Sequence, residues 1–309
     1  MNRQSIAIIG TGLIGASLGL ALRRKSSAIV GWDRKRANAR EAKRRGAITR
    51  IAASLEDAVR DAAVVVLAAP LPEILKMLPR VLRMARSSAL VIDVGGLKVP
   101  VVREAERALR RQSRTKVRHT TARARNAYFV AGHPLAGNER SGPGAARADL
   151  FQGMPFALYA PAQPERASAR RAAERFVRRL GAKPVWVPPA EHDRIVSVTS
   201  ALPQLASTAL ALAWRDAGGP AAGKLAGPGL RGATRLADSP FLVWKASLLG
   251  NRGNVRRALL ALKRRVDMLA KALNGRHERQ LAQLFAAGAG ARRRILQPAR
   301  RKTAATHRY

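Results

Sequence analysis

The sequence predicts an α/β domain followed by an all-helical domain. Short apolar segments alternate with longer helical patterns from Ser5 to Val187, and only helical periodicity follows Pro189. The chain has 309 residues, of which 47% are hydrophobic, so it is long and apolar enough to bury two cores. We therefore expect domains at residues 1–189 and 190–287, followed by a basic tail at 288–309 that is disordered at its end.

Seven segments of the first domain have the composition of β-strands. Several of them are apolar without interruption, which is typical of strands covered by helices on both faces of a mostly parallel sheet. The segments are residues 5–9, 28–32, 63–69, 89–94, 128–131, 156–159 and 184–187.

The turn after the first strand carries Gly10, Gly12 and Gly15 in G-x-G-x-x-G spacing and opens a helix. In this pattern the first glycine allows a tight turn, the second lets the backbone approach a pyrophosphate, and the third allows close packing of helix and strand. Asp33 ends the second strand 18 residues after Gly15, where a carboxylate can bind a ribose 2′-hydroxyl. We expect a Rossmann-type dinucleotide-binding domain, with cofactor contacts from Gly10, Gly12, Leu13, Ile14, Gly15, Asp33 and Arg34.

The carboxylate of Asp33 favours NAD because it repels a 2′-phosphate. Arg34 and Lys35 follow it directly and would weaken that preference, so NADP stays an alternative. For Asp33 itself the alternative is a residue that only initiates a turn.

The uncharged run from Ser5 to Leu22 has nearly the length of a membrane span or signal peptide. The glycine spacing directly after a strand pattern favours the nucleotide-binding turn instead, so we expect no membrane partner and a cytoplasmic location. The chain has no cysteine, which excludes disulfides, thiolate catalysis and cysteine-ligated zinc. His, Asp and Glu show no metal-ligand spacing, and we expect no metal.

The chain is strongly basic, with 58 Lys and Arg against 19 Asp and Glu and a net charge of +39. These residues are scattered through almost every segment, and aromatic residues make up only 4%. Because nucleic-acid sites gather basic residues on one face and use aromatic stacking, a solvated surface is favoured. Binding of nucleic acid or an acidic partner stays the alternative.

A late helical pattern has apolar residues at alternating spacings of 4 and 3. They are Val255, Leu259, Leu262, Val266, Leu269 and Leu273. Such a heptad seam packs either on the core of its own domain or on a second copy, so a homodimer through the helical domain is expected.

One histidine stands at a strand end. In "AGHPLAGNERSG", residues 131–142, His133 lies between a glycine and a proline, at the start of a glycine-rich turn. It is either a hydrogen-bonded structural residue or a proton-transfer group aimed at a ligand, and these residues alone leave both readings open.

Several segments resemble the prephenate and arogenate dehydrogenase family over residues 5–285. They are "IIGTGLIGASLGLAL", "AAP" (68–70), "DVGGLK" (93–98), "AGHPLAGNERSG", "EHDRIV" (191–196), "TSALPQ" (199–204) and "GLRGATRLADSP" (229–240). The resemblance implies an N-terminal dinucleotide-binding domain and a helical dimerisation domain. The implied reaction is the NAD-dependent oxidative decarboxylation of prephenate or arogenate to 4-hydroxyphenylpyruvate or tyrosine, in tyrosine biosynthesis.

The resemblance also implies roles for residues. His133 matches the catalytic histidine, Arg231 matches the arginine that grips a substrate carboxylate, and Ala69 and Pro70 join the cofactor site. Arg235 either supports Arg231 or faces solvent. His192 and Asp193 match a pair at the domain junction and are expected to be structural or supporting rather than catalytic.

Three positions depart from the family pattern. Gly96 stands in place of a serine, Ala201 in place of a histidine and Gly232 in place of an aspartate. Without these three polar side chains there are two alternatives. Either the site is organised through Gln204, Ser200, Thr199 or Lys98, or its activity is weak or lost. The expected substrate-binding residues are Arg231, Gly96, Lys98 and Gln204. Two alternatives remain open, another two-domain hydroxyacid dehydrogenase and a family member that has become a binding protein.

Overall fold

The computed structural model describes residues 5–26, 28–116, 127–137, 140–163, 166–218 and 222–297. The chain forms two compact units, Met1–Val255 and Arg256–Tyr309. The histidines His119 and His307 and the end of the basic tail lie outside the described residues.

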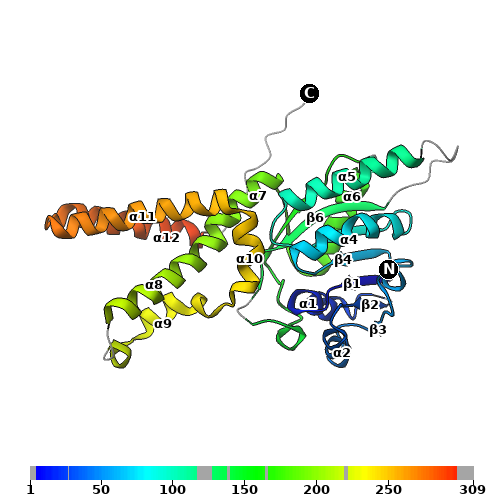
Figure 1. Cartoon of the computed structure of the whole chain (residues 1–309), viewed down its shortest axis with the longest axis horizontal. Helices are drawn as coiled ribbons and strands as arrows, with labels where there is room; N and C mark the ends of the chain where they lie inside the picture. The colour runs from blue at the N-terminus through cyan, green and yellow to red at the C-terminus, as the bar shows by residue number, and fades with distance from the viewer. Residues whose placement is uncertain are drawn as a thin grey trace. The chain divides into compact units, whose positions relative to one another are not determined.

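An eight-stranded sheet forms the centre of the first unit (Figure 1). In chain order its strands are β1 (Ile6–Ile9), β2 (Ile29–Trp32), β3 (Arg50–Ile51), β4 (Val64–Leu67), β5 (Leu90–Asp93), β6 (Tyr128–Pro134), β7 (Pro155–Tyr159) and β8 (Lys183–Trp186). In space the order is β3-β2-β1-β4-β5-β6-β7-β8. Neighbours from β3 to β6 pair in parallel, β7 runs antiparallel to β6, and β8 is parallel to β7. The predicted α/β class is confirmed, and the two-residue strand β3 is an addition to it.

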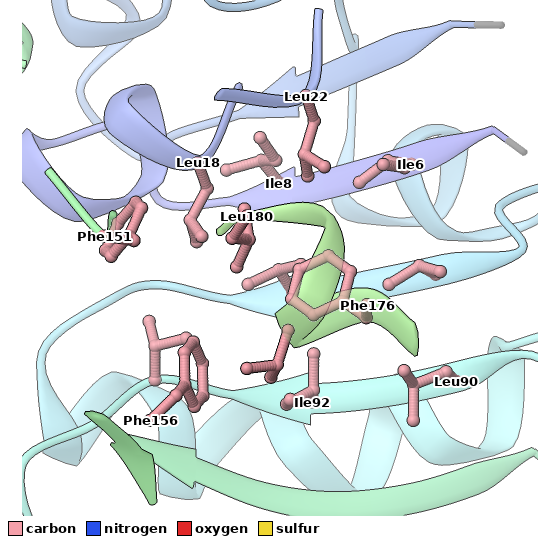
Figure 2. Close-up of a cluster of buried hydrophobic side chains, with 14 of the residues drawn as sticks. Ile6, Ile8, Leu18, Leu22, Leu90, Ile92, Phe151, Phe156, Phe176 and Leu180 are labelled. Carbon is pink, nitrogen blue, oxygen red and sulfur yellow. The ribbon is translucent and has the colours of Figure 1, made fainter. Parts of the chain in front are cut away.

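Helices cover both faces of this sheet, because alternate residues of the central strands point to opposite sides. On β1, Ile6 and Ile8 belong to one buried cluster, while Ala7 and Ile9 belong to the other. Figure 2 shows the first cluster, where Leu18 of α1 and Phe176 of α6 come together over the sheet. The helices of this domain are α1 (Leu13–Leu22), α2 (Arg36–Arg44), α3 (Leu55–Val59), α4 (Leu71–Met84), α5 (Val99–Lys116) and α6 (Arg166–Arg179).

Four further helices belong to the same compact unit: α7 (Pro189–Val196), α8 (Leu202–Gly218), α9 (Pro228–Thr234) and α10 (Phe241–Gly250). Buried hydrogen bonds join α7 to the sheet domain, since Asp193 accepts from the backbone N–H groups of Lys98 and Val99 at the start of α5. The first compact unit extends to Val255, beyond the boundary expected at residues 189 and 190.

A π-helical turn, Ser197–Ala201, joins α7 to α8, so Pro189–Gly218 is one continuous helical stretch. By length and composition alone this stretch is long and apolar enough to cross a membrane. Part of its apolar surface has a role inside the protein, because Ile195, Val196 and Pro203 line the cavity described below.

The end of the chain is helical. Helix α11 (Arg252–Asn274) contains the heptad seam, and three seam residues are exposed in the single chain: Leu259 (39%), Val266 (55%) and Leu273 (64%). Helix α12 (Glu278–Leu296) includes Gly288–Leu296, so the expectation of a tail that begins at Gly288 is wrong for these residues. Alanines on both sides of the glycines favour the helix, and Arg293 and Arg294 in its last turn interact favourably with the helix dipole.

Candidate active site

The three glycines of the turn after β1 have three different surroundings. Gly10 has a φ of +98°, and a Cβ there would lie 2.4 Å from the carbonyl oxygen of Ala68. At Gly15 a Cβ would lie 1.9 Å from the carbonyl oxygen of Gly10, so α1 packs against the turn only because this side chain is missing. A Cβ at Gly12, in contrast, meets no atom of the described chain within 4 Å. Gly10 and Gly15 are therefore required by the fold, and Gly12 leaves open space for a ligand.

The N-terminus of α1 opens onto that space. Gly12 is its N-cap, and no described side chain caps the helix there. The first backbone N–H groups, which belong to Leu13 and Ile14, are thus available to an anion, and the helix dipole adds to their attraction.

Asp33 lies beside this turn, directly after β2. Its Oδ2 accepts a hydrogen bond of 2.8 Å from the backbone N–H of Thr11, and its Oδ1 accepts one of 2.8 Å from the backbone N–H of Lys35. Asp33 thus initiates a turn and also holds the glycine turn against the end of β2. The exposed Arg34 reaches Glu73, with 3.4 Å between the nitrogen and the oxygen.

Ala69 and Pro70 follow β4, and Pro70 is the N-cap of α4. Strand β1 lies between β2 and β4, so the sheet order reverses here. In open α/β sheets, ligands bind outside the carboxyl ends of the strands at such a switch point. The predicted cofactor residues from Gly10 to Pro70 lie together at this edge.

A cavity of about 740 Å³ lies beside His133, between strands β6 to β8, helices α7, α8 and α10, and the 3-10 turn Arg235–Asp238. Most of its lining is apolar, and a few polar groups converge in it: His133, His192, Thr199, Ser200, Gln204 and Arg235. An apolar cavity with few polar groups is the usual form of a small-molecule site.

His133 lies near the end of β6, opposite Ala157 of β7. Its Nδ1 is 2.9 Å from Nε2 of His192, and Nδ1 of His192 is 2.8 Å from Oδ1 of Asp193. Burial lowers the pKa of His133 well below 6.5, and the charge of Lys98 and the neighbouring His192 act in the same direction. At neutral pH the ring is therefore neutral and has a lone pair that can accept a proton.

The contact between His133 and His192 was not predicted. The sequence marked His192 and Asp193 as a structural or supporting pair, and the structure places His192 in the cavity lining and in direct contact with His133. His192 and Asp193 are almost fully buried, with 3% and 4% of their surface exposed.

Lys98 does not lie where a substrate contact was expected. It is 1% exposed, and its Nζ is 2.5 Å from Oδ2 of Asp93 and 2.5 Å from the carbonyl oxygen of Gly132. Burial raises the pKa of Asp93 and lowers that of Lys98, and each partner opposes the shift of the other. Lys98 supports the strand end that carries His133 and is not among the residues that line the cavity.

The two candidate arginines have different positions. Both arginines are exposed, but Arg235 lines the cavity, and Arg231 on α9 is not among the described residues that line it. Helix α9 ends at Thr234 and a 3-10 turn, Arg235–Asp238, follows, so the helical phase changes between the two arginines. Of the expected substrate residues, Gln204 lines the cavity and Arg231 does not.

The three positions that depart from the family pattern have different surroundings. Ala201 is buried in the π-helical turn, and Gly232 is exposed. Gly96 is not among the cavity residues, and a Cβ there would come within 3.1 Å of the Ser247 hydroxyl oxygen. Among the residues that the structure describes, no group of three or more His, Asp and Glu side chains is arranged to hold a metal ion.

Two family models match this chain. The model of the prephenate dehydrogenase nucleotide-binding domain matches residues 18–186, and that of the prephenate dehydrogenase dimerization domain matches residues 188–287. Among curated relatives, prephenate dehydrogenase of Bacillus subtilis is 31% identical over 258 residues, which are 82% of this chain and 66% of the relative. Prephenate dehydrogenase of Lactococcus lactis is 28% identical over 293 residues, 92% of this chain and 75% of that protein. The chain thus spans about two thirds of the length of the first relative.

Solved structures show the same fold. Prephenate dehydrogenase from A. aeolicus, in complex with hydroxyphenyl propionate and NAD+, has a TM-score of 0.81 and 24% identity, covering 96% of this chain and 99% of its own. Synechocystis arogenate dehydrogenase has a TM-score of 0.74 and 24% identity, covering 94% of this chain and 100% of its own.

Proposed function

The chain belongs to the prephenate dehydrogenase family, and on this premise we propose that it catalyses the NAD-dependent oxidative decarboxylation of prephenate or arogenate. The observation that carries the proposal is His133, a half-buried and neutral histidine that lines an apolar cavity with Arg235. The products are 4-hydroxyphenylpyruvate from prephenate and tyrosine from arogenate, which places the reaction in tyrosine biosynthesis.

The residues of the glycine turn fit the cofactor. Gly12 leaves room for a pyrophosphate at the uncapped N-terminus of α1. A ribose hydroxyl would bind Asp33 in place of one of its longer contacts, with the Thr11 hydroxyl at 3.2 Å or the Asn38 amide at 3.4 and 3.5 Å. A carboxylate at this position disfavours the 2′-phosphate of NADP. When bound, NAD accepts the hydride from the ring carbon that carries the hydroxyl group.

His133 accepts the proton of that hydroxyl group as the carbon becomes a ketone. When the ring carboxylate leaves as carbon dioxide, its electron pair moves through the ring to the same oxygen, which takes a proton back. The histidine therefore holds one proton for part of the cycle and returns it, so turnover needs no net proton release at this site.

Arg235 supplies a cation for a substrate carboxylate. A guanidinium can bind both carboxylate oxygens at once, and the apolar walls of the cavity strengthen that attraction. Gln204, Ser200 and Thr199 line the same cavity and offer hydrogen bonds for the remaining polar groups of the substrate.

The helical part forms a homodimer, since the exposed seam of α11 belongs to the segment that matches a dimerization domain. We place the enzyme in the cytoplasm, as expected for a chain without cysteines and with a dinucleotide substrate.

The test is the formation of NADH from NAD+, followed by absorbance with prephenate and, separately, with arogenate. His133→Asn should keep the fold and NAD binding but lower kcat by about 100- to 10,000-fold, the usual effect of losing a general base. Because the pKa of His133 is lowered, the parent rate should stay constant through neutral pH and fall only in acid, well below pH 6.5.

His277→Gln is the matched control, because His277 lies at the N-cap of α12 and not in the cavity, and this variant should keep the parent rate. A parent that oxidises neither substrate would favour the alternative of a binding protein. An active parent whose rate survives His133→Asn would refute the role of this residue.

A further inference from the structure

We infer that His192 and Asp193 are positioning residues that hold His133 in one tautomer, with its proton on Nδ1 and its Nε2 free to accept a proton from the substrate. The inference rests on the proposed function for the identity of the substrate. The arrangement itself follows from three hydrogen bonds of the chain, read outward from Asp193.

Asp193 fixes the first proton. Its Oδ1 accepts from the backbone N–H of Lys98 at 2.8 Å, and its Oδ2 accepts from the backbone N–H of Val99 at 3.0 Å. Val99 begins α5, a helix of 18 residues, so both the N–H groups and the helix dipole stabilise the charged carboxylate. An ionised carboxylate can only accept hydrogen bonds, and Nδ1 of His192 must therefore donate to it.

The position of the proton on His192 determines the position of the proton on His133. In a neutral imidazole only one nitrogen carries a proton, so a proton on Nδ1 leaves Nε2 of His192 as an acceptor. The partner at 2.9 Å is Nδ1 of His133, which must then carry its own proton and donate. Nε2 of His133 is left without a proton, in the form that a general base requires.

The hydrogen bonds that run from Asp193 through His192 to His133, which we call the relay, are held in one arrangement. Asp193 is 4% exposed, and its backbone carbonyl accepts a further hydrogen bond of 2.7 Å from the side chain of Asn251. The two imidazole rings meet edge to face, with an interplanar angle of 68°. Water has little access to His192, which is 3% exposed, so the hydrogen bonds to His133 and Asp193 are the ones its ring makes.

The surrounding charges act in the same direction. Lys98, itself paired with Asp93, lowers the pKa of His133, and so would a protonated His192. In the resting protein the charge of Lys98 disfavours protonation of His133, and Asp193 is the anion in direct contact with His192.

The first experiment needs neither substrate nor cofactor. Long-range ¹H–¹⁵N NMR of the ¹⁵N-labelled full chain reports which ring nitrogen of each histidine is protonated. The chain has five histidines, and the signal that disappears in His133→Asn identifies His133. At neutral pH the signal of His133 should show a proton on Nδ1 and none on Nε2. A His133 protonated on Nε2 would overturn the inference whatever the enzyme turns over.

The second experiment compares two substitutions of His192. In His192→Gln the amide oxygen still accepts from Nδ1 of His133, while His192→Leu removes the acceptor. The leucine variant should lose at least about tenfold in kcat, with KM changed by less than about threefold, and the glutamine variant should recover part of that loss. Asp193→Asn should reverse the relay, because its amide group can donate to Nδ1 of His192, and should shift the His133 proton toward Nε2.

The outcomes separate this inference from the proposed function. A protein that oxidises neither prephenate nor arogenate contradicts the proposed function, and the NMR result still decides the relay. An active enzyme whose His192→Leu variant keeps kcat within about twofold and keeps the parent pH profile contradicts the relay alone. If the leucine variant does not fold, the glutamine variant and the NMR of the parent give the decision.

Discussion

The buried pair of Lys98 and Asp93 allows a quantitative prediction. Substitution of Lys98 by Met keeps most of the side-chain volume and removes the ammonium group. Among the described groups, the carboxylate of Asp93 then keeps the backbone N–H groups of Gly95 at 2.9 Å and Gly132 at 3.1 Å. Removing one partner of a buried ion pair costs about 3 to 5 kcal/mol, and domains have only about 5 to 15 kcal/mol of stability, so Lys98→Met should be strongly destabilised.

The destabilisation should depend on pH. Burial already raises the pKa of Asp93, and Lys98 opposes that shift, so in Lys98→Met the folded-state pKa rises further. A carboxyl group with a raised pKa contributes most to stability below its unfolded-state pKa, near 4, and loses that contribution as pH rises to the folded-state value. The free energy of unfolding of the variant should therefore fall by up to about 1.4 kcal/mol for each pH unit in this window.

Urea denaturation followed by circular dichroism measures both effects, at pH about 5 and about 7.5. Lys43→Met is the matched control, because Lys43 is exposed on α2, and it should change stability by no more than about 0.5 kcal/mol. In the double variant that combines Lys98→Met with Asp93→Asn, the second substitution removes the buried charge, so the added pH dependence should disappear. A Lys98→Met variant within about 1 kcal/mol of the parent at both pH values would refute the reasoning.

Two further predictions concern the cofactor turn and the dimer. Gly12→Ala should fold normally and bind NAD more weakly, measured by calorimetry, while Gly15→Ala should be destabilised because its Cβ meets the Gly10 carbonyl; equal effects of the two would contradict this assignment. Glutamates at Leu262 and Leu269 should convert a dimer into monomers or unfold the helical domain, measured by light scattering, since they bury unpaired charge. A monomeric parent at micromolar concentration would contradict the dimer.

Much of the sheet could be predicted because its signals are local. Strands covered on both faces are apolar at every position, as in β4, and Gly10 and Gly15 of the turn after β1 are required by backbone atoms close by. Strand β3 gave no such signal. It has two residues, and Arg50 is exposed, so neither length nor hydrophobicity distinguishes it from a loop.

Other features depend on contacts that a sequence pattern does not contain. A buried lysine is unusual, and Lys98 is buried because the Asp93 carboxylate and the carbonyl of Gly132, from another strand, both meet its ammonium group. Arg231 and Arg235 are four residues apart and would share a face of a continuous helix. The chain changes from α-helix to 3-10 helix after Thr234, and of the two arginines Arg235 lines the cavity; nothing in the residue types marks that change.

The partner of His133 is the clearest case of a contact that only the fold determines. His133 lies at a strand end and His192 lies 59 residues later on α7, so no periodicity links them. The sequence did contain one usable signal, an aspartate directly after a histidine at the expected domain junction. Asp193 caps the start of α5, a helix far away in sequence, and the same bonds that dock α7 on the sheet domain bring the neighbouring imidazole to His133. Docking and orientation of the base are thus one set of contacts, and a substitution at Asp193 must be judged by the tautomer of His133 as well as by stability.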